Sequence, residues 1–197
     1  MKPETVELKK WDQFLYESQN LSSINLIFQD YPELSSFGTV EDYSRYLSSI
    51  FPNSKLKDIV YHGGTLDPGD RGKDPFTGEF GGKYGIYFTG SKSRAKKYIS
   101  ASSDKTYKER SMIYSAILDI KNPLDKKIWG RWKFGLDRIG DKEFSIIKQN
   151  NSDGLIEKGF IPRITQYNSQ YVVFNLDQIH ILGSEEDISG FKIFMNK

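Results

Sequence analysis

The sequence predicts an α+β protein in which a helical section precedes a mostly antiparallel sheet. Two observations lead to this fold class. Apolar side chains recur at helical spacing before Pro52, whereas short runs rich in β-branched and aromatic residues follow it. The chain contains no internal repeat and no low-complexity tract. We therefore expect a helical extension over residues 1–54, packed on a core domain formed by residues 55–197.

Two helices are expected in the first section. The first covers residues 4–19, where an apolar stripe is formed by Leu8, Trp11, Phe14 and Leu15. The second begins at Thr39, whose hydroxyl is suited to cap a helix, and Asp42 three residues later completes a weak capping box. Its apolar positions are Tyr43, Tyr46, Leu47 and Ile50. Pro52 ends this helix, and residues 21–28 are ambiguous.

Beyond Pro52 the sequence predicts short strands and one short helix. The expected strands cover 58–62, 85–89, 111–120, 154–156, 171–174 and 179–182, and the expected helix covers 92–100. Residues 63–83 contain seven glycines and two prolines and are expected to form a long loop. Residues 125–150 combine helix and loop signals, and the apolar residues 191–194 are expected to add an edge strand.

Composition excludes several classes of protein. The absence of cysteine excludes a disulfide scaffold, a thiolate nucleophile and a zinc–cysteine site, and the two histidines belong to no metal-ligand cluster. No apolar stretch approaches the roughly 18 residues of a membrane span. A net charge of +2 does not indicate a nucleic-acid or membrane partner. The charged start of the chain resembles no secretory signal, so a cytoplasmic protein is expected.

Three separated segments carry the functional signal. They are Tyr61-His62-Gly63-Gly64-Thr65, then Gly85-Ile86-Tyr87-Phe88-Thr89, and Gln170-Tyr171-Val172-Val173-Phe174-Asn175. Tyr98 follows Tyr87 by eleven positions, with the small residue Ala95 between them. In this order the segments resemble the His-Tyr-Glu branch of the ADP-ribosyltransferases, which includes diphtheria toxin and the poly(ADP-ribose) polymerases. Residues 153–156 and 175–179 further resemble the phage-associated ADP-ribosyltransferases of polyvalent proteins, and the resemblance covers about residues 55–183.

The resemblance implies a fold of two packed, mostly antiparallel sheets around a cleft that binds NAD as co-substrate. Tyr87 and Tyr98 would hold the nicotinamide between their rings, an interaction worth roughly 1–3 kcal/mol. The backbone at Gly63 would bind the carboxamide, and His62 would bind a ribose hydroxyl. This hypothesis requires His62, Tyr87, Tyr98 and Gln170 to converge on one cleft. Placement of His62 and Gln170 on opposite faces of the sheet would contradict it.

The third segment departs from the family at Gln170, where a glutamate is usual. His62, Tyr87 and Gln170 are the candidate catalytic residues. In the family, the glutamate carboxylate at the position of Gln170 stabilises the cation that forms when the nicotinamide–ribose bond breaks. An amide accepts a hydrogen bond from the ribose but supplies neither the charge nor a general base. The chemical step should therefore be slow unless Glu157 or another acid compensates, and a mono-ADP-ribosyltransferase or a weak NAD glycohydrolase fits better than a polymerase.

Two alternatives remain open: a pseudoenzyme that binds NAD or ADP-ribose, and a non-catalytic phage structural or interaction protein. The resemblance places the chain in the cytoplasm of a bacterial host, encoded by a phage or mobile element. Its acceptor is unknown, with a protein expected before a nucleic acid, and no metal or membrane partner is implied. The acceptor is expected to dock along residues 160–169, where Arg163, Tyr167 and Asn168 are candidate contacts.

Overall fold

The computed structural model describes residues 20–66, 85–102, 104–130, 139–157 and 169–197. The expected helix over residues 4–19, most of the predicted long loop and most of the predicted acceptor segment lie outside these ranges. The described residues form two compact units, of which one contains 20–52 and 182–197 and the other lies within 53–181. The C-terminal residues thus group with the N-terminal helices. The packing of the helical section on the core stays a prediction.

The first unit is helical. Residues 20–30 form a helix, and the 3-10 helix η1 (Pro32–Ser36), α2 (Val40–Ile50) and α7 (Glu185–Met195) follow in chain order. The predicted start of α2 is confirmed. The Thr39 hydroxyl accepts a hydrogen bond from the Asp42 amide at 3.2 Å, and the Asp42 carboxylate accepts one from the Thr39 amide at 2.9 Å.

The expected edge strand over residues 191–194 is wrong, because α7 covers this segment. Ser184 caps the helix by accepting a hydrogen bond from the Asp187 amide at 3.2 Å, and acidic side chains fill the first turn. Asp187 and Phe191, four residues apart, are both buried on the side of α7 that meets α2. A local capping signal and helical spacing therefore outweigh the β propensity of the last apolar residues.

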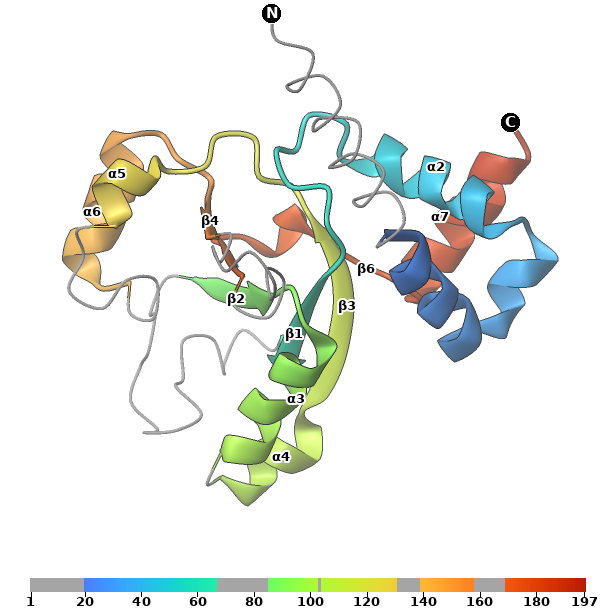
Figure 1. The fold of residues 1–197 in the computed structure, drawn as a ribbon, viewed down its shortest axis with the longest axis horizontal. Coiled ribbons are helices and arrows are strands. Elements are labelled where there is room, and N and C mark those ends of the chain that lie inside the picture. Colours follow the sequence, from blue (N-terminus) through green and yellow to red (C-terminus); the bar gives the residue numbers. More distant parts are fainter. Residues whose placement is uncertain (1–19, 67–84, 103, 131–138, 158–168) are drawn as a thin grey trace, which may run out of the picture. The chain divides into compact units, whose positions relative to one another are not determined.

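The second unit is built on a sheet. Its strands are β1 (Val60–Gly64), β2 (Ile86–Thr89), β3 (Met112–Leu118), β4 (Gly154–Glu157), β5 (Gln170–Val173) and β6 (Ile179–Ile181). Their order is β4-β5-β2-β1-β3-β6, and every neighbouring pair is antiparallel. The predicted α+β class with an antiparallel sheet is confirmed. Where two packed sheets were expected, however, the described residues form one curled sheet (Figure 1).

The junction of β1 and β2 divides this sheet into two halves. β1 is paired with β3 along its whole length, and β2 with β5 along its whole length. Between β1 and β2 only one pair is registered, Tyr61 with Thr89. The halves β4-β5-β2 and β1-β3-β6 are therefore joined by one registered pair. We call the place where β1 and β2 stop pairing, just beyond Tyr61 and Thr89, the fork.

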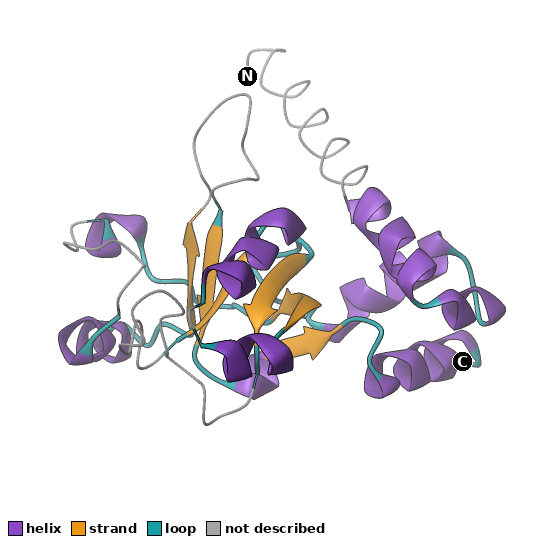
Figure 2. Cartoon of the chain, turned by 90° about the horizontal axis from the view of Figure 1, so that it is seen from below, coloured by secondary structure: helices purple, strands orange, loops and turns teal. Residues whose placement is uncertain are grey.

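The two faces of the sheet have separate cores. One face carries a cluster that includes Val60, Phe88, Leu118 and Tyr171. On the other face, side chains of β4 and β5 pack against α5 (Lys126–Trp129) and α6 (Asp141–Gln149). The helices α3 (Lys92–Ala101) and α4 (Lys105–Arg110) follow β2, and α3 packs against β1. Figure 2 shows the strands in the middle of this unit with helices outside them.

Candidate functional site

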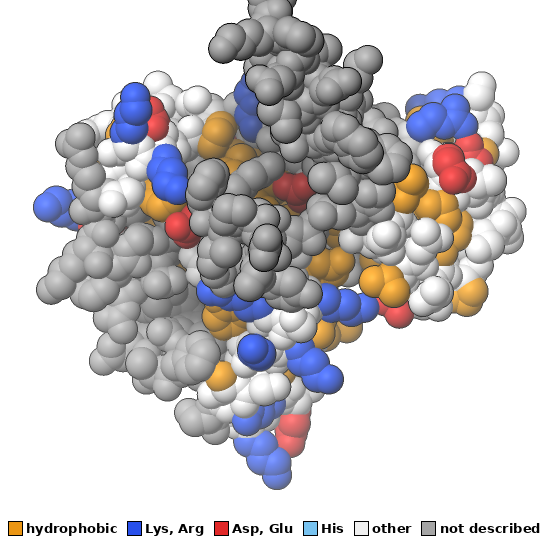
Figure 3. Space-filling view, in the orientation of Figure 1, with side chains coloured by type: hydrophobic (Ala, Val, Ile, Leu, Met, Phe, Trp, Pro, Cys, Tyr) orange, Lys and Arg blue, Asp and Glu red, His pale blue; other side chains and the backbone are white. Residues whose placement is uncertain are grey.

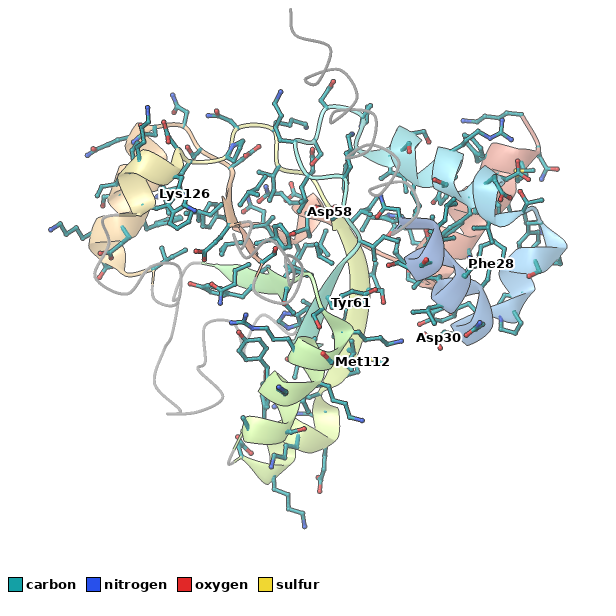
Figure 4. All side chains as sticks on the ribbon, viewed as in Figure 1. Phe28, Asp30, Asp58, Tyr61, Met112 and Lys126 are labelled. Atoms are coloured by element: carbon teal, nitrogen blue, oxygen red, sulfur yellow. The ribbon has the colours of Figure 1, made fainter. Side chains whose placement is uncertain are left out.

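Gln170 belongs to a row of side chains that crosses four strands. It is paired with Thr89 of β2 on one side and with Glu157 of β4 on the other. Thr89 is in turn paired with Tyr61 of β1, which Figure 4 labels. Paired residues of antiparallel strands point to the same face, with Cβ atoms about 4.5–5.5 Å apart. Glu157 and Gln170 are both partly exposed, so the row brings a carboxylate next to the candidate catalytic amide at an accessible place.

His62 lies at the fork. Its Nδ1 is 2.8 Å from the backbone oxygen of Tyr87, and its Nε2 is 3.2 Å from the backbone oxygen of Thr65. The first contact crosses from β1 to β2 just beyond the Tyr61–Thr89 pair, where the two strands no longer pair with each other. The imidazole therefore fills the place of the missing ladder hydrogen bonds and links the two halves of the sheet.

The surroundings of His62 favour the neutral ring. Burial lowers the pKa of His62, and the two backbone carbonyls oppose this shift only in part. A neutral imidazole carries one N–H and donates to one carbonyl. We assign the proton to Nδ1, because its contact with the Tyr87 carbonyl is the shorter one. Nε2 then keeps a lone pair, which is suited to accept a hydrogen bond from a hydroxyl of a ligand.

Because successive side chains of a strand point to opposite faces of the sheet, His62 does not share the face of the row that contains Gln170. Tyr61 and Thr89 point to the face of Gln170, so the Cβ of His62 points to the other face. Its ring centroid lies 5.5 Å from that of Phe88, which belongs to the core of that other face. This is the placement that contradicts a shared pocket for His62 and Gln170 on one face of the sheet. A single ligand would meet both residues only at the fork, where β1 and β2 stop pairing.

The two candidate nicotinamide-binding tyrosines lie on different elements. Tyr87 points to the face of Gln170, two residues from Thr89, and its partly buried ring packs against the apolar cluster that contains Val172. Tyr98 is partly exposed on α3, where its hydroxyl accepts a hydrogen bond from Arg94 Nε at 3.3 Å. The convergence of both rings with His62 and Gln170 on one ligand stays a prediction.

Gly63 has a packing role that the sequence hypothesis did not include. A Cβ added to this residue would overlap the backbone carbonyl of Ala95 and lie 3.0 Å from its Cα. The absence of a side chain thus lets the backbone of α3 approach β1 directly. Ala95 is fully buried at this contact, which explains the small residue between Tyr87 and Tyr98. Binding of the nicotinamide carboxamide by Gly63 remains an expectation.

The side chain of Gln178 forms hydrogen bonds at the end of β5, the strand that contains Gln170. Its Oε1 accepts hydrogen bonds from the amides of Phe174 and Asn175 at 3.0 and 3.1 Å. Its Nε2 donates to the backbone oxygens of Asp119 and Asp153 at 2.9 and 2.7 Å. This buried amide therefore uses its full hydrogen-bonding capacity to join the ends of β3 and β5 to the start of β4. The residues around 153 and 178 that resemble the phage-associated family have a structural role here.

Besides Tyr61, two members of the row are not among the candidate site residues. In the sequence, Glu157 is only a possible compensating acid, and Thr89 is only part of its motif. The hydroxyl of Thr89 is buried and has no hydrogen-bond partner among the described residues. Neither residue has a distinctive local sequence. Only the pairing of β4, β5 and β2, which are far apart in the chain, brings them beside Gln170.

Among the described side chains, no group of three or more His, Asp and Glu is placed to hold a metal ion.

Of the described helices, none is both long and apolar enough to span a bilayer.

Comparisons with family models, with curated proteins and with solved structures found no match for this chain.

Proposed function

We propose that this chain is an NAD-dependent mono-ADP-ribosyltransferase with an ADP-ribosyltransferase-like fold, whose NAD site lies at the fork. The observation that carries the proposal is the pairing of Glu157 with Gln170. It supplies a carboxylate next to the position where the family's glutamate is replaced. Nε2 of His62 and the ring of Tyr87 border the same fork, and both have the chemistry required to bind a ribose and a nicotinamide.

Gln170 and Glu157 would together perform the role that a single glutamate has in the family. Gln170 accepts a hydrogen bond from the ribose 2′-hydroxyl and orients the sugar. Glu157 contributes the negative charge that stabilises the oxocarbenium-like transition state. The bond between C1′ and the nicotinamide nitrogen breaks, and its electron pair leaves with neutral nicotinamide. The acceptor nucleophile then bonds to C1′, and its proton passes to Glu157.

A second candidate function is an NAD-binding pseudoenzyme. Gln170 itself favours it, because an amide cannot act as a general base. The contact of Nε2 with the Thr65 carbonyl also favours it, because in the other tautomer Nε2 donates to this carbonyl and has no lone pair for a ligand hydroxyl.

Incubation with labelled NAD, read out as nicotinamide release and label transfer, tests the proposal. We expect Glu157→Gln to lower nicotinamide release about 100-fold, a typical general-base contribution, with NAD affinity unchanged. Tyr87→Ala should weaken NAD binding about tenfold through lost stacking. Glu41→Gln, which removes an exposed carboxylate of α2, is the matched control and should change neither quantity.

Exchanging the glutamine and the glutamate between positions 170 and 157 gives a second test of the proposed role of the carboxylate. The double variant Gln170→Glu/Glu157→Gln returns the carboxylate to the position usual in the family and keeps the same net charge. It should release nicotinamide faster than Glu157→Gln alone. A tight NAD complex without turnover in every variant would favour the pseudoenzyme. No NAD binding at millimolar concentration would contradict both functions.

A further inference from the structure

The positive charge of this chain is concentrated in one segment. Residues 92–110 contain seven basic and two acidic side chains, a net charge of +5, although the whole chain carries only +2. The rest of the chain is therefore net −3. The basic residues are Lys92, Arg94, Lys96, Lys97, Lys105, Lys108 and Arg110. We call the surface formed by α3 and α4 the basic surface.

Most of this charge faces solvent. The side chains of Lys96 and Lys97 on α3, and of Lys105 and Lys108 on α4, are exposed. Among the described residues, these four lysines form no ion pair. Figure 3 shows blue side chains gathered over α3 and α4, with few red ones between them. Cations that outnumber acids in this way create a local positive potential that the net charge of the chain conceals.

We propose that the basic surface binds the phosphate backbone of a nucleic acid. The ten residues of α3 extend over about 15 Å, which matches about four phosphates of one strand at an axial spacing of about 3.4 Å. A membrane surface fits less well, because insertion requires large apolar side chains beside the basic ones. The exposed large apolar residues of the described chain all lie outside α3 and α4.

This inference goes beyond the NAD chemistry and does not depend on it. We expected a protein acceptor before a nucleic acid, and the net charge of +2 does not by itself indicate a nucleic-acid partner. The charge distribution reverses that order. Because α3 also carries Tyr98 and packs on Gly63, a nucleic acid bound there would lie beside the candidate NAD site. The same surface would then bring an acceptor to the fork.

Binding of fluorescent 20-nucleotide RNA and DNA, single-stranded and duplex, tests the proposal without NAD. The full chain should bind with an affinity that falls steeply as salt rises from about 50 to 200 mM. The variant Lys96→Gln/Lys97→Gln/Lys105→Gln/Lys108→Gln should bind at least about tenfold more weakly at the lower salt. The slope of log K against log[salt] should become shallower by about 3–4 for a duplex.

The matched control removes four exposed lysines from another part of the same unit. It is the variant Lys126→Gln/Lys127→Gln/Lys142→Gln/Lys148→Gln on α5 and α6, of which Lys126 is labelled in Figure 4. Both variants have the same net charge, so retention of binding by the control alone would support the basic surface. Equal loss in both variants, no binding of any probe at about 50 mM salt, or tighter binding to anionic phosphatidylserine vesicles would overturn the proposal.

Discussion

The imidazole of His62 combines an observed structural position with a proposed ligand-binding one. It links β1 to β2 through the Tyr87 carbonyl at the fork, and the proposed function also assigns it a ribose hydroxyl. Its neutral form suits both tasks, because Nδ1 donates to the Tyr87 carbonyl while Nε2 keeps a lone pair. Protonation would remove this acceptor and place a charge in a poorly solvated site.

The stability of the chain should therefore depend on pH through His62. Its pKa is lower in the folded chain than the value of about 6.5 in an unfolded chain, so the unfolded state binds the proton first as the pH falls. The stabilisation is complete above about pH 6.5 and decreases as the pH falls from there towards the folded pKa. Urea unfolding of the native chain and of His62→Gln between about pH 7.5 and 5.5 measures this slope. Equal slopes in both proteins would show that His62 is not responsible.

The contact of α3 with β1 is decided by a glycine. Because Gly63 has no side chain, the carbonyl of Ala95 comes directly against the strand. This approach positions α3, and with it Tyr98 and two of the four exposed lysines, Lys96 and Lys97. The helix that carries the proposed stacking residue and part of the proposed nucleic-acid surface thus depends on one close backbone contact.

Gly63→Ala should disrupt this contact. Its Cβ would meet backbone atoms of α3, which cannot move as a side chain does, so we expect a loss of about 3 kcal/mol in the free energy of unfolding. Gly140→Ala is the control. Its Cβ would meet only a carboxylate oxygen of Glu143 at 3.1 Å, and the change to a poorer N-cap should cost about 1 kcal/mol or less. Chemical denaturation of both variants tests the difference, and similar losses would refute the packing argument.

On the scale of the whole molecule, the two units use different kinds of core. The sheet unit buries aliphatic and aromatic side chains on both faces of its strands. The helical unit instead has a fully buried carboxylate, Asp187, among its aromatic residues. The Tyr43 hydroxyl and the Gly183 amide donate to this carboxylate, and the Tyr46 hydroxyl donates to the backbone oxygen of the same residue. Burial raises the pKa of Tyr43, which keeps its hydroxyl protonated as a donor.

Tyr43→Phe should therefore destabilise the helical unit. It leaves a buried carboxylate oxygen without one of its donors, which typically costs about 1–3 kcal/mol. Tyr46→Phe removes a hydrogen bond to a backbone carbonyl and should cost less, about 1 kcal/mol. Hydrogen exchange of the amides in α2 and α7 measures both effects. Greater loss of protection in Tyr46→Phe than in Tyr43→Phe would contradict the central role assigned to the carboxylate.

Local signals in the sequence were sufficient for most elements. The capping box at Thr39, the run of β-branched and aromatic residues that forms β3 and the short helix after Ser91 are decided by nearby residues. A capping signal is also present at Ser184, where an N-cap and an acidic first turn begin α7, although an edge strand was expected near the end of this segment. The helix α4 was also not predicted, because its six residues are too few to show a period.

The sequence by itself determined the α+β class, the positions of the six strands and of the helices α2 and α3, and the residue types that suggest NAD chemistry. Only the tertiary structure decided that Glu157 and Thr89 flank Gln170, and that His62 points away from their row into a fork. The physical reason is that strand register depends on partners distant in the chain, and a shift of one residue moves every side chain to the other face. The glutamine at position 170 is thus informative only beside its neighbour Glu157 across the strand pair.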